Sequence, residues 1–456
     1  MTIPAVVAGA LAGTMGLSAA SAFAADTQPT TAEAMQKQID ALKAQVQQLQ
    51  GQQPTMSSKA VDDTVARVLE DADKRSQLMQ VEGFTAGWNN GRFAIMSADG
   101  NSSIMPYLQV QFRSTSNIDT GGEDDNTEWG FSLPRVKLGF DGTIYSKDLS
   151  YYFRWNSGDS DGGGSGALNL EQAWARYMFA DQMGVRAGQF IDPVFKEQLV
   201  NSDSQLAADR SLLNTIITGA DESYTQGVTF IWMPDPRMNL EVGLTDGINT
   251  GNTSFRDFPN GPANFGIAGR FEFAVFGNVD DTRGFTAMGT KEDVLVIGAG
   301  ADFTQAGNTD NVLHTVDVQW EGMDGRLGVY GAYVGQYLQN GSGTGITGVT
   351  DGDDDNYNWG ILVQAGWMLN SDWEIFGRYD MTSLDSDIAV GSTGQTQDNF
   401  QEVTIGLNHY FKGQNAKWTL DVSWLPNGAP TGASNLGILN SDDTEFVVRT
   451  QFQLML

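Results

Sequence analysis

The chain of 456 residues contains no cysteine and only two histidines, His314 and His409. Without cysteine, neither a disulfide framework nor a thiolate metal site can form. Neither histidine neighbours the serine and aspartate pattern of a hydrolytic triad, and two histidines provide little for a zinc site. We therefore expect no enzyme activity and no cofactor.

Basic residues are also scarce, with 26 Lys and Arg against 56 Asp and Glu and a net charge of −30. Such a chain repels phosphate backbones, so nucleic acid is excluded as a partner.

Long apolar runs are missing after residue 25, where no stretch approaches the roughly 18 consecutive apolar residues of a spanning helix. The first 25 residues are uncharged and lead to Ala22-Phe23-Ala24. This A-x-A site predicts a secretory signal peptide over residues 1–24, although the usual Lys or Arg before the apolar core is absent. A single membrane anchor is the alternative.

Residues 25–81 predict a short helical neck. Apolar residues at alternating spacings of four and three indicate a coiled-coil seam of about two heptads, formed by Met35, Ile39, Leu42, Val46 and Leu49. A second helical pattern covers about residues 61–80. A single amphipathic helix on a surface is the alternative for the first pattern.

From residue 82 onward the apolar period changes to two. In "YLQVQF", Leu108, Val110 and Phe112 share one face of a strand, with Gln109 and Gln111 on the other. About sixteen segments of roughly ten residues repeat this alternation to the C-terminus. The pattern predicts an all-β domain over residues 82–456.

The connections between these segments differ in length. Short ones alternate with long ones rich in Gly, Asp, Asn and Ser, and residues 277–293 are the clear exception. Outer-membrane barrels have short periplasmic turns and long external loops. We therefore predict a transmembrane antiparallel β-barrel in the outer membrane. A soluble β-sandwich or solenoid is the alternative.

One long connection, residues 192–222, has no strand pattern but several apolar residues. A long structureless loop of this kind is usually functional or disordered. Its apolar side chains predict that it folds inward, packs on the barrel wall and constricts the pore. We call it the inward loop. An external loop that stabilises an oligomer is the alternative.

Several motifs resemble the phosphate-selective porin O and P family. They are "RVKLGFDGTIYSKDLSYYFRWNSG", "LNLEQAWARYMF", "VRAGQFIDPVFKEQLVNS", "ADRSLLN" and, near the end, "GRYD", "VTIGLNHYF" and "VRTQFQ". The resemblance covers about residues 90–456. It implies a sixteen-stranded trimeric barrel whose third loop enters the pore, and passage of anions such as phosphate.

Candidate pore-lining and anion-binding residues follow from strand parity and from the inward loop. They are Arg113, Arg135, Lys137, Arg154, Arg176, Arg186, Lys196 and Arg210. Rows of side chains that carry the same sign of charge set the ion selectivity of a pore. Well-characterised members of the family have more basic residues, and acids share these faces here, so a structural role in ion pairs is the alternative.

We interpret the chain as an outer-membrane porin, a water-filled diffusion channel for small hydrophilic solutes, with anions such as phosphate preferred. Its expected partners are outer-membrane lipid, these solutes and two further copies in a homotrimer. The periplasmic neck offers a contact with the cell wall. The alternatives are a general or cation-preferring porin, and a closed barrel that tethers the outer membrane to the wall.

Overall fold

The computed structural model describes most of the chain from residue 84 onward. Its described residues are 39–41, 43–44, 84–89, 92–120, 126–158, 167–254, 263–339, 355–385, 398–429, 436–438 and 444–456. The chain divides into two compact units, Met1–Val81 and Glu82–Leu456. The predicted signal peptide and nearly all of the neck lie outside the described residues.

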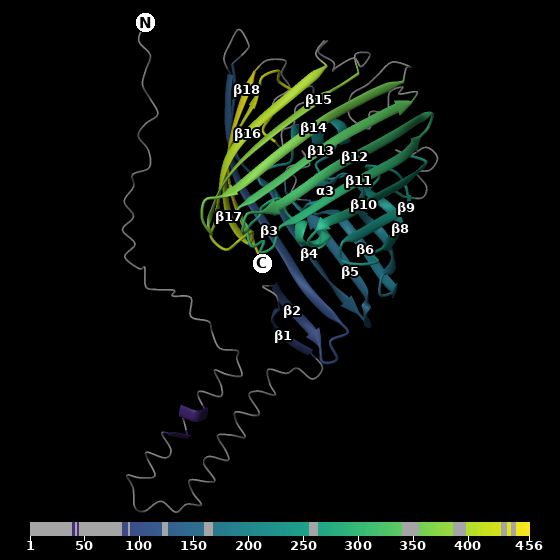
Figure 1. Cartoon of the computed structure of the whole chain (residues 1–456), viewed down its shortest axis with the longest axis vertical. Helices are drawn as coiled ribbons and strands as arrows, with labels where there is room; N and C mark the ends of the chain where they lie inside the picture. The colour runs from purple at the N-terminus through teal and green to yellow at the C-terminus, as the bar shows by residue number, and fades with distance from the viewer. Residues whose placement is uncertain are drawn as a thin grey trace, which may run out of the picture. The chain divides into compact units, whose positions relative to one another are not determined.

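The second unit is a closed antiparallel barrel of sixteen strands, β3 to β18, because β18 pairs with β3 (Figure 1). The first eight strands are β3 (Ser103–Asp119), β4 (Asn126–Ile144), β5 (Ser146–Asn156), β6 (Asn169–Ala180), β7 (Met183–Ile191), β8 (Tyr224–Trp232), β9 (Met238–Thr245) and β10 (Phe265–Phe276). The other eight are β11 (Val294–Ala306), β12 (Thr309–Gly322), β13 (Leu327–Gln339), β14 (Asn356–Met368), β15 (Trp373–Ser383), β16 (Asn399–Tyr410), β17 (Ala416–Leu425) and β18 (Glu445–Met455). The predicted fold class and strand number are confirmed.

A hairpin precedes the barrel. Its strands β1 (Phe84–Asn89) and β2 (Arg92–Ser97) pair with each other, and β2 continues briefly onto β3. Arg92 forms an ion pair with Asp141 of β4 at 2.6 Å. No helix among the described residues is long and apolar enough to cross a membrane.

The strands alternate as their sequences predict. On β3, Leu108 and Phe112 are 42% and 48% exposed, whereas Gln109, Gln111 and Arg113 are at most 1% exposed. The apolar side chains therefore face outward, as a lipid environment requires, and the polar ones face the interior.

Short and long connections lie at opposite ends of the barrel. At one end the turns are short, as at Tyr145 between β4 and β5, except for residues 277–293 between β10 and β11. At the other end they are long, except for the two-residue turn Gly307–Asn308 between β11 and β12. This second exception was not predicted.

The inward loop connects β7 to β8 and contains two short helices, α3 (Lys196–Leu199) and α4 (Leu212–Thr218). The Ser211 side chain caps the start of α4 by accepting a hydrogen bond from the Asn214 backbone N–H. Gly219 ends the helix with a φ of 71°, a left-handed conformation that favours glycine.

Candidate functional site

The apolar side of the inward loop packs on the inner barrel wall. Phe195, Leu206 and Leu213 form one buried cluster with wall residues such as Leu362 of β14 and Phe376 of β15. Leu212 and Ile216 belong to a second cluster, with Phe400, Leu425, Leu436 and Val447. The loop therefore lies inside the barrel and covers the inner wall on this side.

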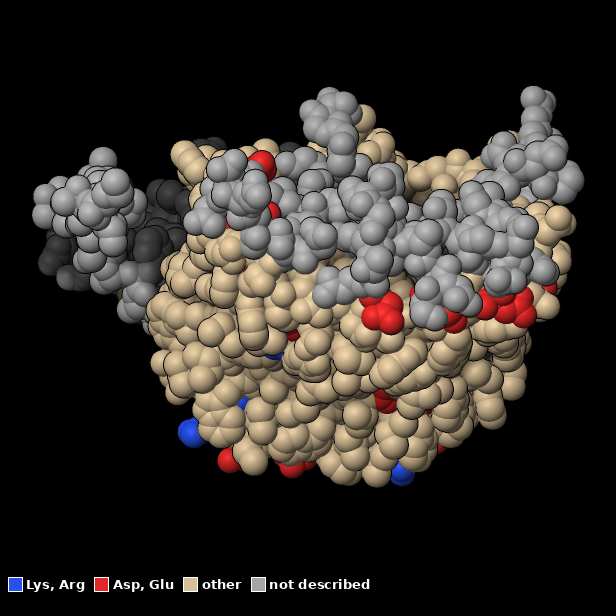
Figure 2. All heavy atoms as spheres, turned by 90° about the horizontal axis from the view of Figure 1, so that it is seen from above, with Lys and Arg blue, Asp and Glu red and all other residues tan. Residues whose placement is uncertain are grey.

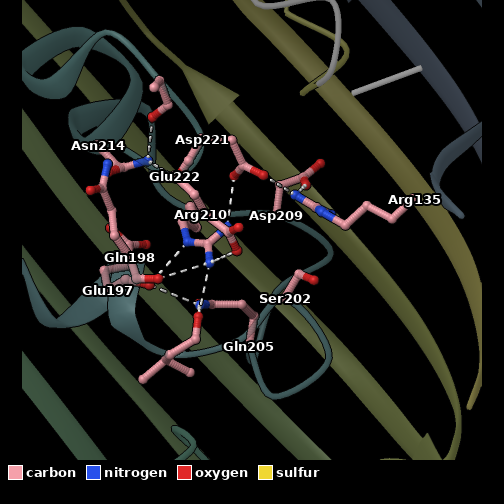
Figure 3. A network of polar contacts seen from close by, with 12 residues as sticks. Arg135, Glu197, Gln198, Ser202, Gln205, Asp209, Arg210, Asn214, Asp221 and Glu222 are labelled. Atoms are coloured by element: carbon pink, nitrogen blue, oxygen red, sulfur yellow. Dashed lines mark hydrogen bonds and ion pairs between the residues drawn. The ribbon is translucent and has the colours of Figure 1, made fainter. Parts of the chain in front are cut away.

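The polar side of the loop is organised around Arg210 (Figure 3). Its guanidinium forms ion pairs with Asp221 at 2.9 Å and with Glu222 at 2.7 Å. It also donates to the backbone carbonyls of Glu197 and Val200 at 3.0 and 2.8 Å. Because Arg210 is 1% exposed, these contacts replace its hydration and fix the loop to itself.

Basic side chains of the wall hold the same acids. Arg135 of β4 forms ion pairs with Asp209 at 2.8 Å and with Asp221 at 2.7 Å, and Arg113 of β3 also pairs with Asp209. Lys137 pairs with Glu222 at 3.5 Å, and with Glu171 of β6 at 2.8 Å. This network fastens the loop to β3 and β4, and Lys137 also links β4 to β6.

The pKa values of these loop acids reflect their partners. Burial alone would raise the pKa of Asp221, but Arg135 and Arg210 outweigh it and lower the pKa. Burial would also raise the pKa of Glu222, but Lys137 and Arg210 outweigh it and lower the pKa to about 2. Burial would raise the pKa of Asp209 too, but Arg113 and Arg135 outweigh it and lower the pKa. The three acids are therefore charged at neutral pH.

Strands β15 to β17 hold the loop mainly through its backbone. Arg378 donates to the Asp209 carbonyl at 2.7 Å, and Lys417 donates to the Gln205 carbonyl at 2.9 Å. In return, Glu402 accepts from the Leu212 N–H at 3.1 Å. These contacts complete a ring of polar attachments around the loop.

Several inward-facing side chains on β5, β6, β7 and β9 keep partial exposure, unlike the basic side chains under the loop. Tyr152, Trp174 and Arg176 are half-buried, and the side chains of Arg186 and Glu241 are 14% and 16% exposed. Since Trp174 stands opposite Tyr152 and Arg176 opposite Arg186 on the inner face, the solvent that reaches them is inside the barrel. This sector borders the open part of the interior.

Arginines and aromatic rings alternate along this sector. Arg154 lies over the rings of Tyr107 and Tyr152, with its guanidinium carbon 4.1 and 5.0 Å from their centroids. Tyr152 stacks on Trp174 at 5.2 Å, with 6° between the ring planes. Arg186 lies 5.7 Å from the Trp174 centroid. The rings hold the guanidinium groups in place by cation–π contacts.

The eight candidate residues thus divide into two groups. Six form ion pairs with acids, namely Arg113, Arg135, Lys137, Arg186, Lys196 and Arg210. Among the described residues, Arg154 and Arg176 have no carboxylate within ion-pair distance. Arg154 donates to the Asn201 side chain at 3.1 Å, and Arg176 to the Ser150 hydroxyl at 3.3 Å.

The loop acids Asp209, Asp221 and Glu222 were not among the residues predicted from the sequence. The sequence contained one indication of their role, because the loop has acids as well as apolar residues and the strands have inward-facing basic residues that could pair with them. Within the described part of the chain, no three metal-binding side chains come together.

Residues 108–455 match the sequence profile of the phosphate-selective porin O and P family. The chain belongs to this family. An uncharacterised protein of Aquifex aeolicus is 23% identical to this porin over 361 residues, which cover 71% of this chain and 83% of that protein.

Solved porins share the fold at low sequence identity. The anion-selective porin from Comamonas acidovorans has a TM-score of 0.54 and 13% identity, covering 78% of this porin and 100% of that chain. OmpF of Salmonella typhi, in a complex with daunomycin, has a TM-score of 0.51 and 13% identity, covering 79% and 99%. OprB of Pseudomonas putida has a TM-score of 0.51 and 11% identity, covering 77% and 94%. Family and fold together make this porin an outer-membrane diffusion channel.

Proposed function

We propose that this porin passes small hydrophilic anions, phosphate among them, in preference to cations. The proposal rests on the position of Arg176. It faces the interior, is half-buried, and has no carboxylate within ion-pair distance among the described residues. Its directly opposite neighbour Arg186 is paired with Glu241, so Arg176 is the member of this pair that is left to bind an anion.

The other candidate residues support this role in two ways. Arg186 borders the same part of the interior, and aromatic rings hold both Arg186 and the buried Arg154. The loop-holding residues Arg113, Arg135, Lys137, Lys196 and Arg210 keep the inward loop in place, and their own charges are balanced by paired acids. An anion would exchange part of its hydration for the guanidinium N–H groups of Arg176 and then leave, with no covalent step.

A general or cation-preferring porin is the second candidate. It is favoured by Asp192 at the start of the inward loop, which is 1% exposed. Neither of its carboxylate oxygens has a hydrogen-bond partner among the described residues. Burial, together with Asp302, raises the pKa of Asp192, so this carboxyl would attract cations only at a pH high enough to ionise it.

The assembly and the N-terminal segment belong to the same proposal. We take residues 1–24 as the signal peptide, residues 25–81 as a periplasmic neck able to contact the cell wall, and the barrel as one subunit of a homotrimer. The support is the resemblance to trimeric porins and the coiled-coil spacing of the neck.

The reversal potential across a planar bilayer under a salt gradient tests the preference. The wild-type channel should give the sign of anion selectivity, and Arg176→Glu should weaken or invert it. Lys147→Glu is the matched control, because it makes the same change of charge on an exposed side chain near the β4–β5 turn. A cation-selective wild-type channel would leave a general or cation-preferring porin, and a barrel without conductance would favour the tether.

A further inference from the structure

The connection between β10 and β11, residues 277–293, is the long exception at the short-turn end of the barrel. We call it the β10–β11 segment. It begins with a short 3-10 helix, Val279–Thr282, which Asn278 and Asp281 close with a reciprocal capping box. After this helix the chain turns into the barrel and buries Phe285, which is 2% exposed.

Phe285 lies in the same apolar cluster as the inward loop. Its ring centroid is 4.6 Å from that of Tyr330 on β13, and the cluster also contains Val200 and Leu206 of the loop. The Phe285 backbone N–H donates to the Ser204 carbonyl at 3.2 Å. The two segments, which enter the barrel from opposite ends, therefore meet inside it.

Polar contacts attach the β10–β11 segment to the wall on both sides of Phe285. The Gln319 side chain of β12 donates to the Gly284 carbonyl at 2.5 Å. The Thr286 hydroxyl donates to Glu374 of β15 at 2.8 Å, and the Thr290 hydroxyl donates to Glu321 of β12 at 2.6 Å. These anchors make the segment a fixed support rather than a surface turn.

A cavity of about 600 Å³ lies beside this contact and is lined mainly by the segment, with Ser204 of the loop. Its lining contains both acids and bases, including Asp281, Arg283, Lys291 and Glu292 together with Ser204. Gly284 and Phe285 thus meet the loop near Ser204, and a polar space lies beside this contact.

We propose that the β10–β11 segment is a second element of the constriction, which holds the inward loop from the opposite end of the barrel. Phe285 is its positioning residue: it touches no solute but fixes the position of the loop at Ser204. The width of the passage is then set by both segments. The inference requires that the barrel conducts, but it does not depend on which ions the channel prefers.

Truncation of the ring tests the support. Phe285→Ala leaves an unfilled space beside Ser204 of the loop. The loop should therefore move, and the single-channel conductance should rise by roughly twofold. Phe285→Leu keeps most of the apolar contact and should change the conductance less. Heat-dependent gel mobility reports whether each variant has folded.

A reversible cross-link separates this positioning role from a general loss of stability. A Cβ atom placed on Gly284 would lie 3.3 Å from the Ser204 Cβ, close to the separation of about 3.8 Å in disulfides. Since the chain has no cysteine, Ser204→Cys with Gly284→Cys creates the only thiol pair. Oxidation should form the disulfide and, in the Phe285→Ala background, return the conductance to the wild-type value. Reduction should raise it again.

Two results would overturn the proposal. One is that the double-cysteine variant, otherwise wild-type, fails to form the disulfide under mild oxidation, which would mean that the segments do not meet. The other is that folded Phe285→Ala has wild-type conductance. If Phe285→Ala does not fold, Phe285→Leu decides instead, and wild-type conductance of folded Phe285→Leu would then overturn the proposal.

Discussion

At the scale of single residues, Arg210 shows what the interior basic side chains do. Its guanidinium satisfies two carboxylates and several carbonyls of one loop, so its removal leaves Asp221 and Glu222 buried with less compensation. Breaking a buried pair of this kind costs about 3–5 kcal/mol. Arg210→Ala should therefore lower the free energy of unfolding by about that amount and, by releasing the loop, raise the conductance.

Urea unfolding followed by gel mobility, and bilayer recordings, measure these two effects. Arg210→Lys keeps the charge but loses the planar fork, so its effects should lie between those of wild type and Arg210→Ala. Lys147→Ala, on an exposed side chain, is the control for loss of a basic group. Wild-type stability and conductance in Arg210→Ala would show that the network does not hold the loop.

The sequence predicts which face each of these residues occupies, but not its partners. Strict alternation along β3 and β4 is enough to place Arg113, Arg135 and Lys137 in the interior. Their loop partners Asp209, Asp221 and Glu222 lie in a stretch with no period, about 70 to 100 residues away along the chain. Such pairings depend on the path of the loop through the interior, which no local pattern encodes.

At the scale of elements, helix α4 depends on a gap in the wall. A Cβ atom on Gly360 of β14 would lie only 2.2 Å from the Leu213 Cδ1 atom and 2.4 Å from the Met381 carbonyl oxygen of β15, so the absent side chain makes room for both the helix and the neighbouring strand. Gly360→Ala should push α4 away from β14 and change the single-channel conductance, with a loss of stability of about 1–3 kcal/mol from overpacking.

Gly331 on β13 provides the matched control, because a Cβ atom there would meet nothing closer than 3.8 Å. Gly331→Ala should leave conductance and stability close to wild type. Equal effects of the two substitutions would mean that the alanine acts on the strands and not on the position of the helix.

The two inward elements differ in how far the sequence predicts them. The apolar residues of the inward loop, such as Leu206 and Leu213, are enough to indicate a buried face, and both side chains are buried against the wall. The β10–β11 segment is marked only by its length, since Phe285 is one apolar residue in a polar stretch. A single anchor gives no periodic signal, so its burial follows only from the packed structure.

At the scale of the whole molecule, the scarce basic residues are concentrated inside. Few Lys or Arg side chains reach the part of the surface visible in Figure 2, while Arg113, Arg135, Arg210, Arg449 and Lys137 are among the largest fully buried side chains. A chain with a net charge of −30 thus keeps many basic side chains of its barrel buried, where they pair with acids and hold the inward loop.

The two compact units make different contributions to the assembly. The barrel closes through the β3–β18 pairing, and all of its strands lie in Glu82–Leu456. Deletion of residues 25–81 should therefore leave the conductance and reversal potential of each channel unchanged. If the neck strengthens the trimer through its coiled-coil spacing, the deletion should lower the temperature at which trimers dissociate on gels, because two heptads add only a modest association energy. Altered conductance per channel would instead show that the first unit contributes to the passage itself.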